Sequence, residues 1–449
     1  MNYEVNKSSD NEWLGKIPGH WKVLKLKYAA LVQSSNVDKK GNEGEKPVLL
    51  CNYIDVYKND FIDGTIKFME ATASENEILK FKLLEDDVLI TKDSETPDDI
   101  AIPAYVNQDF DNVLCGYHLA LVRSNKDILK GAYLYYLFKS YRFNQQFTIA
   151  ANGITRFGLS IEDIRNAFIS IPPDSDQLQI ATYLNKKTHQ IDDLISKKQK
   201  LIDLLKEERT AVINQTVTKG LDSSVPMKDS GIEWFGEIPA HWDLITIKKI
   251  CKINPPKSEI HLPELTEVVF LPMEKVSEDG NYNDSELKPL LTLKSGFTYF
   301  AKGDVILAKI TPCFENGKGA FLESLKTPIG FGSTEFHVLR PIVGISDGIY
   351  LYYFTHSNCF TQVGEAFMVG SAGQKRVQTS FLENFFIPLP PYSEQLSIAE
   401  RLRSMLMQID YSIKSIQKEI ELISEYKTSL INEAVTGKID IRDYTINHA

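Results

Sequence analysis

Apolar residues in the stretch 176–218 recur at intervals of three and four, which is the spacing of one face of a helix. This face comprises Ile180, Leu184, Ile191, Ile195, Ile202, Leu205 and Val212. Neither proline nor glycine interrupts the chain between Pro173 and Gly220. A helix of roughly 40 residues is about 60 Å long, at a rise of about 1.5 Å per residue. The pattern therefore predicts a helix that acts as a spacer as well as a core element.

The same apolar pattern occurs a second time, 218 positions further on. At this offset Gln177 aligns with Gln395, among many other identities, and Lys198 takes the place of Ile416. The second stripe comprises Leu402, Leu406, Ile409, Ile413, Ile416, Ile420, Ile423 and Leu430. The repeat defines two half-molecules. Because each stripe is too narrow for burial on all sides, we expect the two long helices to bury each other.

Tryptophan and proline mark a second repeated motif, which precedes each of two variable segments. The first copy has Glu-Trp-Leu-Gly, Ile-Pro and His-Trp within 12–21, and the second has Glu-Trp-Phe-Gly, Ile-Pro and His-Trp within 233–242. Indoles with no acid, base or metal partner nearby usually pack. We therefore interpret each copy, called the Trp clip below, as a hydrophobic contact that docks a domain onto the end of a long helix.

Each Trp clip is followed by about 150 residues that read as short strands and then a helix. Strands are predicted at 48–56, 87–91, 101–106 and 114–122 with a helix at 132–147, and again at 268–271, 304–310, 319–322 and 335–339 with a helix at 348–367. The matched Tyr-Leu-Tyr-Tyr runs in these helices are interpreted as core. The order predicts an α+β fold with a pseudo-two-fold internal repeat. The predicted domains are 1–172 (variable domain 1 with its Trp clip), 173–220 (long helix 1), 221–391 (variable domain 2 with its Trp clip) and 392–449 (long helix 2 with the tail).

Composition narrows the function classes only in part. A formal net charge of −10 argues against non-specific nucleic-acid binding by the molecule as a whole, but it leaves room for a local basic cleft. No apolar run approaches the ~18 residues of a membrane span, and the polar opening 1–11 predicts no signal peptide. Five scattered cysteines and eight histidines without ligand spacing indicate a reducing cytoplasm and no metal site.

Signatures of an enzyme are incomplete throughout the sequence. Asn-Pro-Pro-Lys at 254–257 resembles the tetrapeptide of adenine methyltransferases, but its lysine cannot stack on a flipped base. Gly437-Lys438 is followed by isoleucine and lacks a phosphate-binding loop. We therefore predict no catalytic residue in this chain.

Polar and basic residues instead recur in loops at equivalent positions of the two halves. The candidates for binding are Lys92, Ser94, Tyr117, His118, Asn152, Thr155 and Arg156 in the first half, and Lys309, Thr311, Ser333, Thr334, Ser371, Gln374, Lys375 and Arg376 in the second. Lysines and hydroxyls hold phosphates, and Arg, Asn or Gln can make paired hydrogen bonds to the edges of guanine or adenine. For any single lysine a solvated surface charge is the simpler explanation, so the prediction depends on the recurrence.

The order of these parts resembles the specificity subunit of type I restriction and modification systems. The residues that carry the resemblance are Ile-Pro-Leu-Pro-Pro at 387–391 with Glu394 and Gln395, the weaker copy Ile-Pro-Pro at 171–173 with Asp176 and Gln177, and the doubled Trp clip. The resemblance covers essentially the whole chain. It implies two target-recognition domains, each reading one half of a split double-stranded DNA sequence, and two conserved helices packed as an antiparallel coiled coil.

The resemblance also implies partners and the place of the chemistry. The helix residues expected to pack together and to dock two methyltransferase subunits are Ile180, Leu184, Ile191, Ile195, Ile202, Leu205, Leu402, Ile409, Ile413, Ile416, Ile420 and Ile423. Two restriction subunits with motor and nuclease activity would join them. The chain itself would hold no cofactor, since S-adenosylmethionine, ATP and magnesium belong to the partners. Two other classes remain open: a self-sufficient methyltransferase or nuclease, and a scaffold or transcriptional DNA-binding protein.

Overall fold

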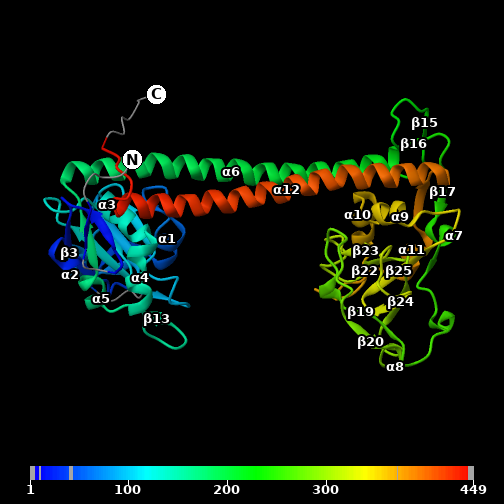
Figure 1. The fold of residues 1–449 in the computed structure, drawn as a ribbon, viewed down its shortest axis with the longest axis horizontal. Helices are drawn as coiled ribbons and strands as arrows, with labels where there is room; N and C mark the ends of the chain where they lie inside the picture. The colour runs from blue at the N-terminus through cyan, green and yellow to red at the C-terminus, as the bar shows by residue number, and fades with distance from the viewer. Residues whose placement is uncertain (1–5, 10–11, 40–43, 372, 443–449) are drawn as a thin grey trace. The chain divides into compact units, whose positions relative to one another are not determined.

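The computed structural model describes residues 6–9, 12–39, 44–371 and 373–442. These residues form two compact units: unit 1 contains residues 1–198 and 418–449, and unit 2 contains residues 199–417. Two long helices, α6 (Asp174–Lys219) and α12 (Tyr392–Val435), each contribute one part to each unit (Figure 1). The chain ends and most of the polar opening 1–11 lie outside the described residues.

Unit 1 contains two main sheets that share a core. The five-stranded sheet has the order β4 (Ala30–Ser34), β12 (Leu119–Ser124), β8 (Asp87–Thr91), β10 (Pro103–Val106) and β6 (Phe61–Ile62). The three-stranded sheet has the order β11 (Val113–Cys115), β5 (Lys46–Cys51) and β7 (Met69–Ala73). Two-stranded ladders join β1 (Asn6–Ser8) to β2 (Lys16–Pro18), β3 (Lys22–Lys25) to β14 (Phe168–Ile171) and β9 (Asp93–Ser94) to β13 (Phe157–Gly158). The helices are α1 (Tyr53–Lys58), α2 (Glu75–Phe81), α3 (Gly131–Lys139), α4 (Tyr141–Ala150) and α5 (Ile161–Asn166).

Unit 2 repeats this plan with two four-stranded sheets. One sheet has the order β18 (Cys251–Ile253), β25 (Phe336–Pro341), β22 (Val305–Ala308) and β23 (Gly319–Phe321), and the other has β20 (Leu287–Pro289), β19 (Glu267–Leu271), β24 (Ile329–Gly332) and β21 (Thr298–Ala301). Ladders join β15 (Met227–Asp229) to β16 (Glu237–Pro239) and β17 (Asp243–Thr246) to β26 (Phe386–Leu389). The helices are α7 (Ile247–Ile250), α8 (Leu290–Leu293), α9 (Gly348–Thr355), α10 (Asn358–Ala366) and α11 (Thr379–Asn384). The mixed sheets and helices confirm the predicted α+β class.

The long helices pack antiparallel within each unit, and their apolar stripes face each other. In unit 1, Ile180, Leu184, Ile191, Leu430 and Ile431 are buried and Ile195 and Ile423 are partly buried in one core. In unit 2, Ile213, Leu402, Leu406 and Ile409 are buried, and Leu205 and Ile413 pack against them. Ile202 is 2% exposed, and Ile416 and Ile420 are partly exposed. Lys198, the polar interruption of the stripe, pairs with Glu419 of α12. The predicted helix pair is confirmed.

Each Trp clip contacts the glycine that ends the long helix of the other repeat. Trp21 of unit 1 is fully buried, and a Cβ on Gly437, just after α12, would lie 3.1 Å from its Cη2 atom. Trp242 of unit 2 is also fully buried, and a Cβ on Gly220, just after α6, would lie 3.2 Å from its Cζ2 atom. The docking role predicted for the clips is confirmed for these two indoles, whereas Trp234 remains 46% exposed.

Buried glutamines fix the start of each long helix to its own variable domain. The Gln177 amide accepts from the backbone N–H of Lys130 at 2.8 Å and donates to two carbonyls, those of Ile128 and Pro172. In unit 2 the Gln395 amide accepts from the Asp347 N–H at 2.8 Å and donates to the carbonyls of Ile345 and Pro390. The repeated Pro-Pro and Gln-Leu motif is therefore a hydrogen-bonded joint.

The tyrosine runs form core, as predicted. The Tyr133 hydroxyl donates to the Val435 carbonyl at 3.2 Å, and the Tyr350 hydroxyl donates to the Val217 carbonyl at 3.2 Å. Both tyrosines are fully buried. Because 217 and 435 are equivalent positions near the ends of α6 and α12, the same bond ties the end of one long helix to the domain of the other repeat.

Several element boundaries were predicted wrongly. The strand predicted at 48–56 stops at Cys51, because Asn52 caps the start of α1 and donates its N–H to the Asp55 carboxylate at 2.8 Å. The strand predicted at 114–122 is two strands separated by a turn in which His118 has φ +72°. The helices predicted at 132–147 and 348–367 are each broken in two, at Ser140 and near Ser357. Across the described ranges, no helix is both long and apolar enough to cross a membrane.

Candidate nucleic-acid interface

The candidate loops of the two units lie at one end of equivalent strand pairs, which are β8 and β12 in unit 1 and β22 and β25 in unit 2. At one end of this pair the frame is fixed by ion pairs: Asp87 receives two hydrogen bonds from Arg123, at 2.7 and 2.6 Å, and Asp304 receives two from Arg340, at 2.7 and 2.8 Å. At the other end Lys92 follows β8, and its N–H donates to the His118 carbonyl at 3.1 Å. In the same way the Lys309 N–H donates to the Glu335 carbonyl at 2.9 Å.

In unit 1 the structure brings four predicted residues together at this edge. The Lys92 ammonium donates to the Ser34 hydroxyl at 2.8 Å and lies 5.2 Å from the centre of the Tyr117 ring. The Tyr117 and His118 rings are 4.3 Å apart, and His118 pairs with the Asp93 carboxylate. Ser94, the fourth of these residues, is 4% exposed and its hydroxyl donates to the Thr96 carbonyl, so it helps to shape the loop.

The remaining predicted residues of unit 1 lie in the exposed loop that leads into β13 (Figure 1). Asn152 pairs with Gly158 across this loop, and its side-chain amide donates to the Ala150 carbonyl at 2.7 Å. Ile154 is 96% exposed and Thr155 is exposed as well. The Arg156 guanidinium makes no hydrogen bond or ion pair with any residue that the structure describes. This loop therefore presents an unpaired cation next to an apolar tip.

Arg156 forms one wall of a cleft of about 430 Å³ that the sequence did not indicate. The other walls come from α1, which contributes Tyr53 and Tyr57, and from the segment after β9, which contributes Glu95 and Asp99. The two tyrosine rings are stacked with centres 5.6 Å apart, and the Tyr57 hydroxyl donates to Asp99 at 2.9 Å. That hydrogen bond raises the pKa of Tyr57, and burial, followed by the charge of Asp99, raises the pKa of Tyr53.

These four residues were missed because the sequence around Tyr53 was interpreted as a continuing strand. On a strand, positions four apart share a face but lie well separated, whereas on a helix they are stacked neighbours. The signal that could have identified the cleft was the capping pattern of Asn52 and Asp55, which favours a helix start. Glu95 and Asp99 lie on a loop whose course only the fold determines.

In unit 2 the equivalent edge has a different set of contacts. The Thr311 hydroxyl makes two hydrogen bonds to the loop: it donates to the Gly373 carbonyl at 3.2 Å and accepts from the Lys375 N–H at 3.1 Å. Ser371, Gln374 and Lys375 are exposed. Lys309 is partly exposed at the base of this loop. The loop of unit 2 therefore offers an amide and ammonium groups.

Arg376, the arginine of the equivalent loop in unit 2, occupies the frame position of Gly158 and is already paired. Its guanidinium makes hydrogen bonds of 3.0 and 2.8 Å to the two carboxylate oxygens of Glu335. The hydrogen bonds from Arg376 hold the pKa of Glu335 below its ordinary value, and the same contact raises the pKa of Arg376. Ser333 accepts from the Glu335 N–H at 3.2 Å, while Thr334 is exposed. In unit 2 the arginine thus holds the loop in place.

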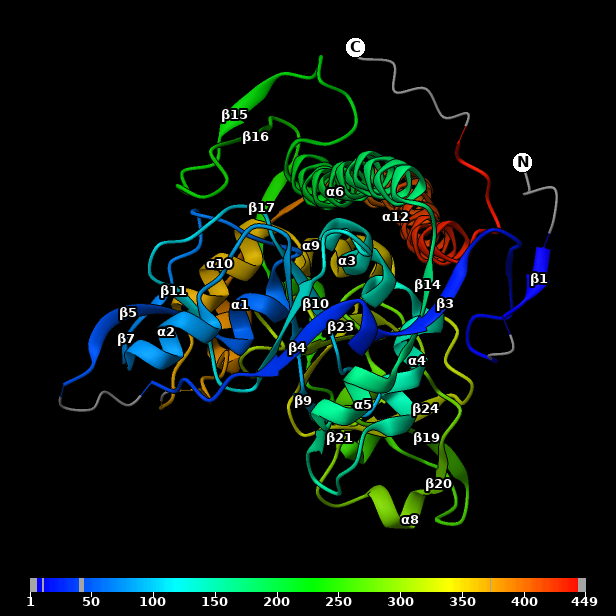
Figure 2. The same ribbon diagram turned by 90° about the vertical axis from the view of Figure 1, so that its left-hand side faces the viewer.

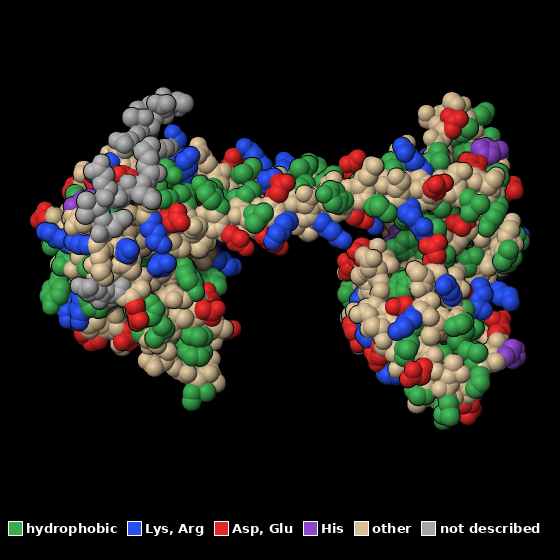
Figure 3. All heavy atoms as spheres, viewed as in Figure 1, with side chains coloured by type: hydrophobic (Ala, Val, Ile, Leu, Met, Phe, Trp, Pro, Cys, Tyr) green, Lys and Arg blue, Asp and Glu red, His purple; other side chains and the backbone are tan. Residues whose placement is uncertain are grey.

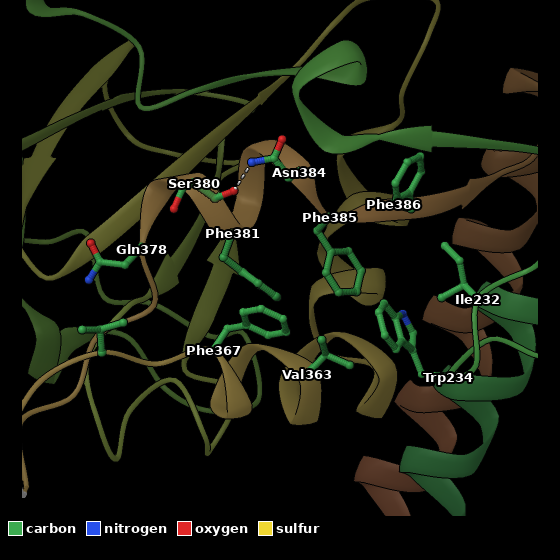
Figure 4. Close-up of a pocket in the computed structure, with 11 residues that line it drawn as sticks. Ile232, Trp234, Val363, Phe367, Gln378, Ser380, Phe381, Asn384, Phe385 and Phe386 are labelled. Carbon is green, nitrogen blue, oxygen red and sulfur yellow. Dashed lines mark hydrogen bonds between the residues drawn. The ribbon is translucent and has the colours of Figure 1, made fainter.

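Unit 2 has a cleft of its own, of about 590 Å³, whose lining is mainly apolar (Figure 4). Trp234 of the Trp clip and Phe385 are stacked with ring centres 6.2 Å apart, and Phe367 and Phe381 line the opposite side. The residues that line this cleft carry no charged side chain. Because neither phosphates nor base edges would find charged partners there, we do not include this cleft in the candidate interface.

The asparagine of the Asn-Pro-Pro-Lys sequence is used structurally. The Asn254 side-chain oxygen accepts from the Val338 N–H at 2.9 Å, and its nitrogen lies 3.2 Å from Nδ1 of His337. Nε2 of His337 lies 2.9 Å from the Val377 carbonyl, and burial lowers the pKa of this histidine to about 4. Both polar ends of Asn254 are therefore occupied by the sheet.

Charge is mixed over the surface of each unit. On the face drawn in Figure 3, Lys and Arg side chains are interspersed with Asp and Glu in unit 1 and in unit 2. Among the residues that the structure describes, no three His, Cys, Asp or Glu side chains are grouped as metal ligands. Any contact with a polyanion would therefore depend on local loops, because neither unit presents a uniformly basic face on this side.

Comparison with known proteins supports this reading of the architecture. The chain is 40% identical over 200 residues to the specificity subunit of the type I restriction enzyme EcoEI from Escherichia coli; the alignment covers 43% of this chain and 33% of that protein. It is 26% identical to a putative MjaX specificity subunit from Methanocaldococcus jannaschii, covering 96% of each chain. The chain thus spans about a third of the length of the Escherichia coli relative.

Solved structures with the same fold include the HsdS subunit from Thermoanaerobacter tengcongensis, with a TM-score of 0.55 at 16% identity over 94% of this chain and 98% of that one. A chain from a study of complex assembly in the type I R-M system gives a TM-score of 0.71 at 16% identity, over 94% and 99%. The family of the type I restriction modification DNA specificity domain matches residues 34–204 and 239–422. With two copies of this domain over most of its length, the chain belongs to the type I restriction-modification specificity family.

Proposed function

We propose that this chain is the DNA-recognition subunit of a type I restriction-modification complex and that each unit reads one half of a split, asymmetric target. The observation that carries the proposal is the combination of one repeated frame with two unlike sets of polar loops at the same edge. Frame contacts such as those of Gln177 and Gln395 are the same in both halves. The loops differ, as Arg156 and Arg376 do, and unlike loops on a shared scaffold suit two different half-sites.

The loops have the chemistry that this role requires. Lys92, Lys309 and Lys375 can hold phosphates, and hydroxyls and backbone N–H groups can position the duplex. Gln374 can bond the edge of adenine, and an arginine can bond guanine. Ile154, exposed at its loop tip, can contact the methyl group of thymine. These contacts would be made in the major groove.

Catalysis would belong to partner subunits bound along the helices. Large apolar side chains lie on the outer faces of α6 and α12: Leu194, Leu422 and Tyr426 in unit 1, and Leu201, Leu204, Met407 and Tyr411 in unit 2, each at least 43% exposed. Leu204 and Leu422 occupy equivalent positions of the repeat. We propose that two methyltransferase subunits bind there and that two restriction subunits join them, bringing S-adenosylmethionine, ATP and magnesium.

The long helices would set the separation of the half-sites. Lys427 of α12 bonds Asp192 of α6 at 2.6 Å, and Arg209 of α6 bonds Asp410 of α12 at 3.2 Å, so each part of one helix has a defined opposite part. An added turn must therefore enter both helices, within 192–206 and 413–427. We expect a spacer of changed length between unchanged half-sites. Altered half-sites would contradict the proposal that the helices set the separation.

The experiment that tests the proposal is co-expression of this chain with its methyltransferase subunit, followed by methylation-sensitive sequencing of the cellular DNA. We expect methylation at one bipartite sequence with an unread spacer. Methylation that does not depend on this chain would overturn the proposal. Binding of S-adenosylmethionine by the purified chain alone would favour a self-sufficient enzyme, and failure to co-purify with a methyltransferase would favour a scaffold or a transcriptional DNA-binding protein.

A further inference from the structure

The cleft of unit 1 combines groups that rarely face a DNA backbone. Two carboxylates, Glu95 and Asp99, stand beside the single cation Arg156. Carboxylates repel phosphates, so a surface that only grips the backbone would not carry two of them. Within the described part of the chain, Glu95 and Arg156 make no side-chain hydrogen bond or ion pair. Both groups are therefore available to a ligand that offers an acceptor and a donor side by side.

The strand ladder brings together the two segments that carry these side chains. β13 pairs antiparallel with β9 so that Phe157 is opposite Ser94 and Gly158 is opposite Asp93. The ladder ends at this pair, and Glu95 and Arg156 are the next residues on the two segments. Gly153 keeps the turn tight, because a Cβ at that position would lie 1.9 Å from the Arg156 carbonyl oxygen. Backbone pairing thus anchors the two segments next to the residues that supply the cation and the carboxylate of the cleft.

The tyrosines hold the second carboxylate and give the cleft a flat wall. Tyr57 donates its hydroxyl to one oxygen of Asp99, which fixes that carboxylate at the edge of the cleft. Tyr53 and Tyr57 are stacked with an interplanar angle of 15°. The cleft therefore contains one fork of donors, two acceptors and an apolar wall within about 430 Å³.

This pattern matches one base pair better than the others. A guanidinium has donors only, and the edge that offers two acceptors to it in the major groove is N7 and O6 of guanine. A carboxylate only accepts, and the amino group N4 of cytosine lies beside the guanine acceptors in the same pair. An A·T pair would leave part of the guanidinium fork unpaired. On the basis of the proposed function, we infer that this cleft specifies a G·C pair in the half-site read by unit 1, with Arg156 reading guanine and Glu95 reading the cytosine amino group.

The test selects bound duplexes from a random-sequence pool with the full chain in complex with its methyltransferase subunit. We expect one half-site to contain an obligatory G·C pair, with discrimination against other pairs of roughly tenfold to a hundredfold. Arg156→Ala should remove this discrimination at that position only. Arg156→Lys should remove it as well, because an ammonium cannot make the paired contact. Retention of the remaining positions of the same half-site shows that unit 1 of these variants folds.

Glu95→Ala provides an independent readout. Removing its charge should weaken selection of the same pair while tightening binding to unrelated DNA, which loss of a purely structural side chain would not do. Lys302→Ala, at an exposed lysine of unit 2 outside the candidate loops, is the matched control and should leave this half-site unchanged. An equal loss of affinity for all sequences on replacing Arg156, with a salt dependence lower by about one phosphate contact, would overturn the inference. So would relaxation at an A·T pair, whereas absence of any selected sequence would overturn the proposed function itself.

Discussion

Arg156 of unit 1 and Arg376 of unit 2 lie in equivalent loops, but their positions in the shared frame differ by two residues and their surroundings are opposite. Leu159 and Val377 make the same backbone bond, to Lys92 and Lys309, so Arg376 occupies the position of Gly158. Arg376 is held by both oxygens of Glu335, whereas the Arg156 guanidinium has no side-chain partner among the residues described and faces an open cleft. The residue whose carbonyl accepts from the Lys92 N–H in unit 1 is His118, and the residue whose carbonyl accepts from the Lys309 N–H in unit 2 is Glu335. Both the residue at this position and the place of the arginine in the loop differ, so Arg376 reaches a carboxylate whereas Arg156 faces the cleft.

The two cores differ in a similar way. His337 of unit 2 is 3% exposed between β22 and β18, at the position that Ala120 occupies in unit 1. His356, whose pKa burial also lowers to about 4, corresponds to Lys139. In contrast, the contacts that hold each domain to the long helices are nearly identical. Duplication preserved the joints, while the domain interiors and their loop edges diverged.

The largest expected effect concerns the buried glutamines that hold α6 and α12 to their domains, and it tests whether these contacts are equivalent in the two units. Gln177→Leu and Gln395→Leu each leave a buried backbone N–H and two carbonyls without their partner. We expect each variant to lower the free energy of unfolding of its own unit by roughly 2–4 kcal/mol, because unsatisfied buried polar groups are costly. Hydrogen exchange of α3 and α9 measures the loss. The neighbouring exposed Leu178 and Leu396 provide controls, for which replacement by Ala should cost under about 0.5 kcal/mol. A response in only one unit would show that the joints are not equivalent.

A second test addresses the two arginines. Arg156→Ala should lower the affinity of the complex for its target by about 1–3 kcal/mol if the side chain makes a paired base contact. Arg376→Ala should lower the affinity less than Arg156→Ala does, since the Arg376 guanidinium is already engaged by Glu335. Equilibrium binding to the cognate duplex at fixed salt gives both values. Equal losses for the two variants would remove the distinction drawn between the loops.

The buried histidine predicts different responses of the two units to acid. The folded pKa of His337 lies below its unfolded value, so between about pH 6.5 and 4 the unfolded state binds more protons. Its neutral form contributes stability that is fully present above pH 6.5 and is lost as the pH falls towards 4. At pH 5 the expected loss is about 2 kcal/mol. Urea unfolding, followed by exchange of peptides from each unit, should show this loss in unit 2.

The variant His337→Gln provides the control for that experiment. It has no titratable group, so this part of the dependence on pH should vanish even if the variant is less stable at pH 7. An unchanged slope in the variant would assign the acid sensitivity of unit 2 to other groups, of which His356 is the first candidate.

The smallest expected effect concerns the contact between α6 and α12 at Lys198. Lys198 pairs with Glu419 where the other stripe has Ile416. Lys198→Ile should change the free energy of unfolding of unit 1 by no more than about 1 kcal/mol, in the stabilising direction, because the lost ion pair is partly exposed and the new side chain extends the apolar stripe. Thermal unfolding measures it, and a marked destabilisation would show that Lys198 has a specific structural role.

Much of the fold followed from periodic features of the sequence. The stripe from Ile180 to Val212 required a long helix, and its repetition required a partner of the same kind. The Trp clips were predicted to pack because an indole has few alternatives. Predicted boundaries were wrong where short polar residues such as Asn52 and Ser140 stop one element and start another, since local capping outweighs propensity over a few residues.

The sequence by itself determined the repeat, the paired helices and the loops in which recognition would occur, because hydrophobic periodicity and internal identity are local properties that can be read along the chain. Only the tertiary structure decided which side chains in those loops remain available. Arg156 and Arg376 look alike in sequence, but the carboxylate of Glu335 that engages Arg376 lies 41 positions away along the chain, a separation that no spacing rule covers. The cleft formed by Tyr53, Glu95 and Arg156 exists because three separate segments meet at one edge, which depends on the fold as a whole.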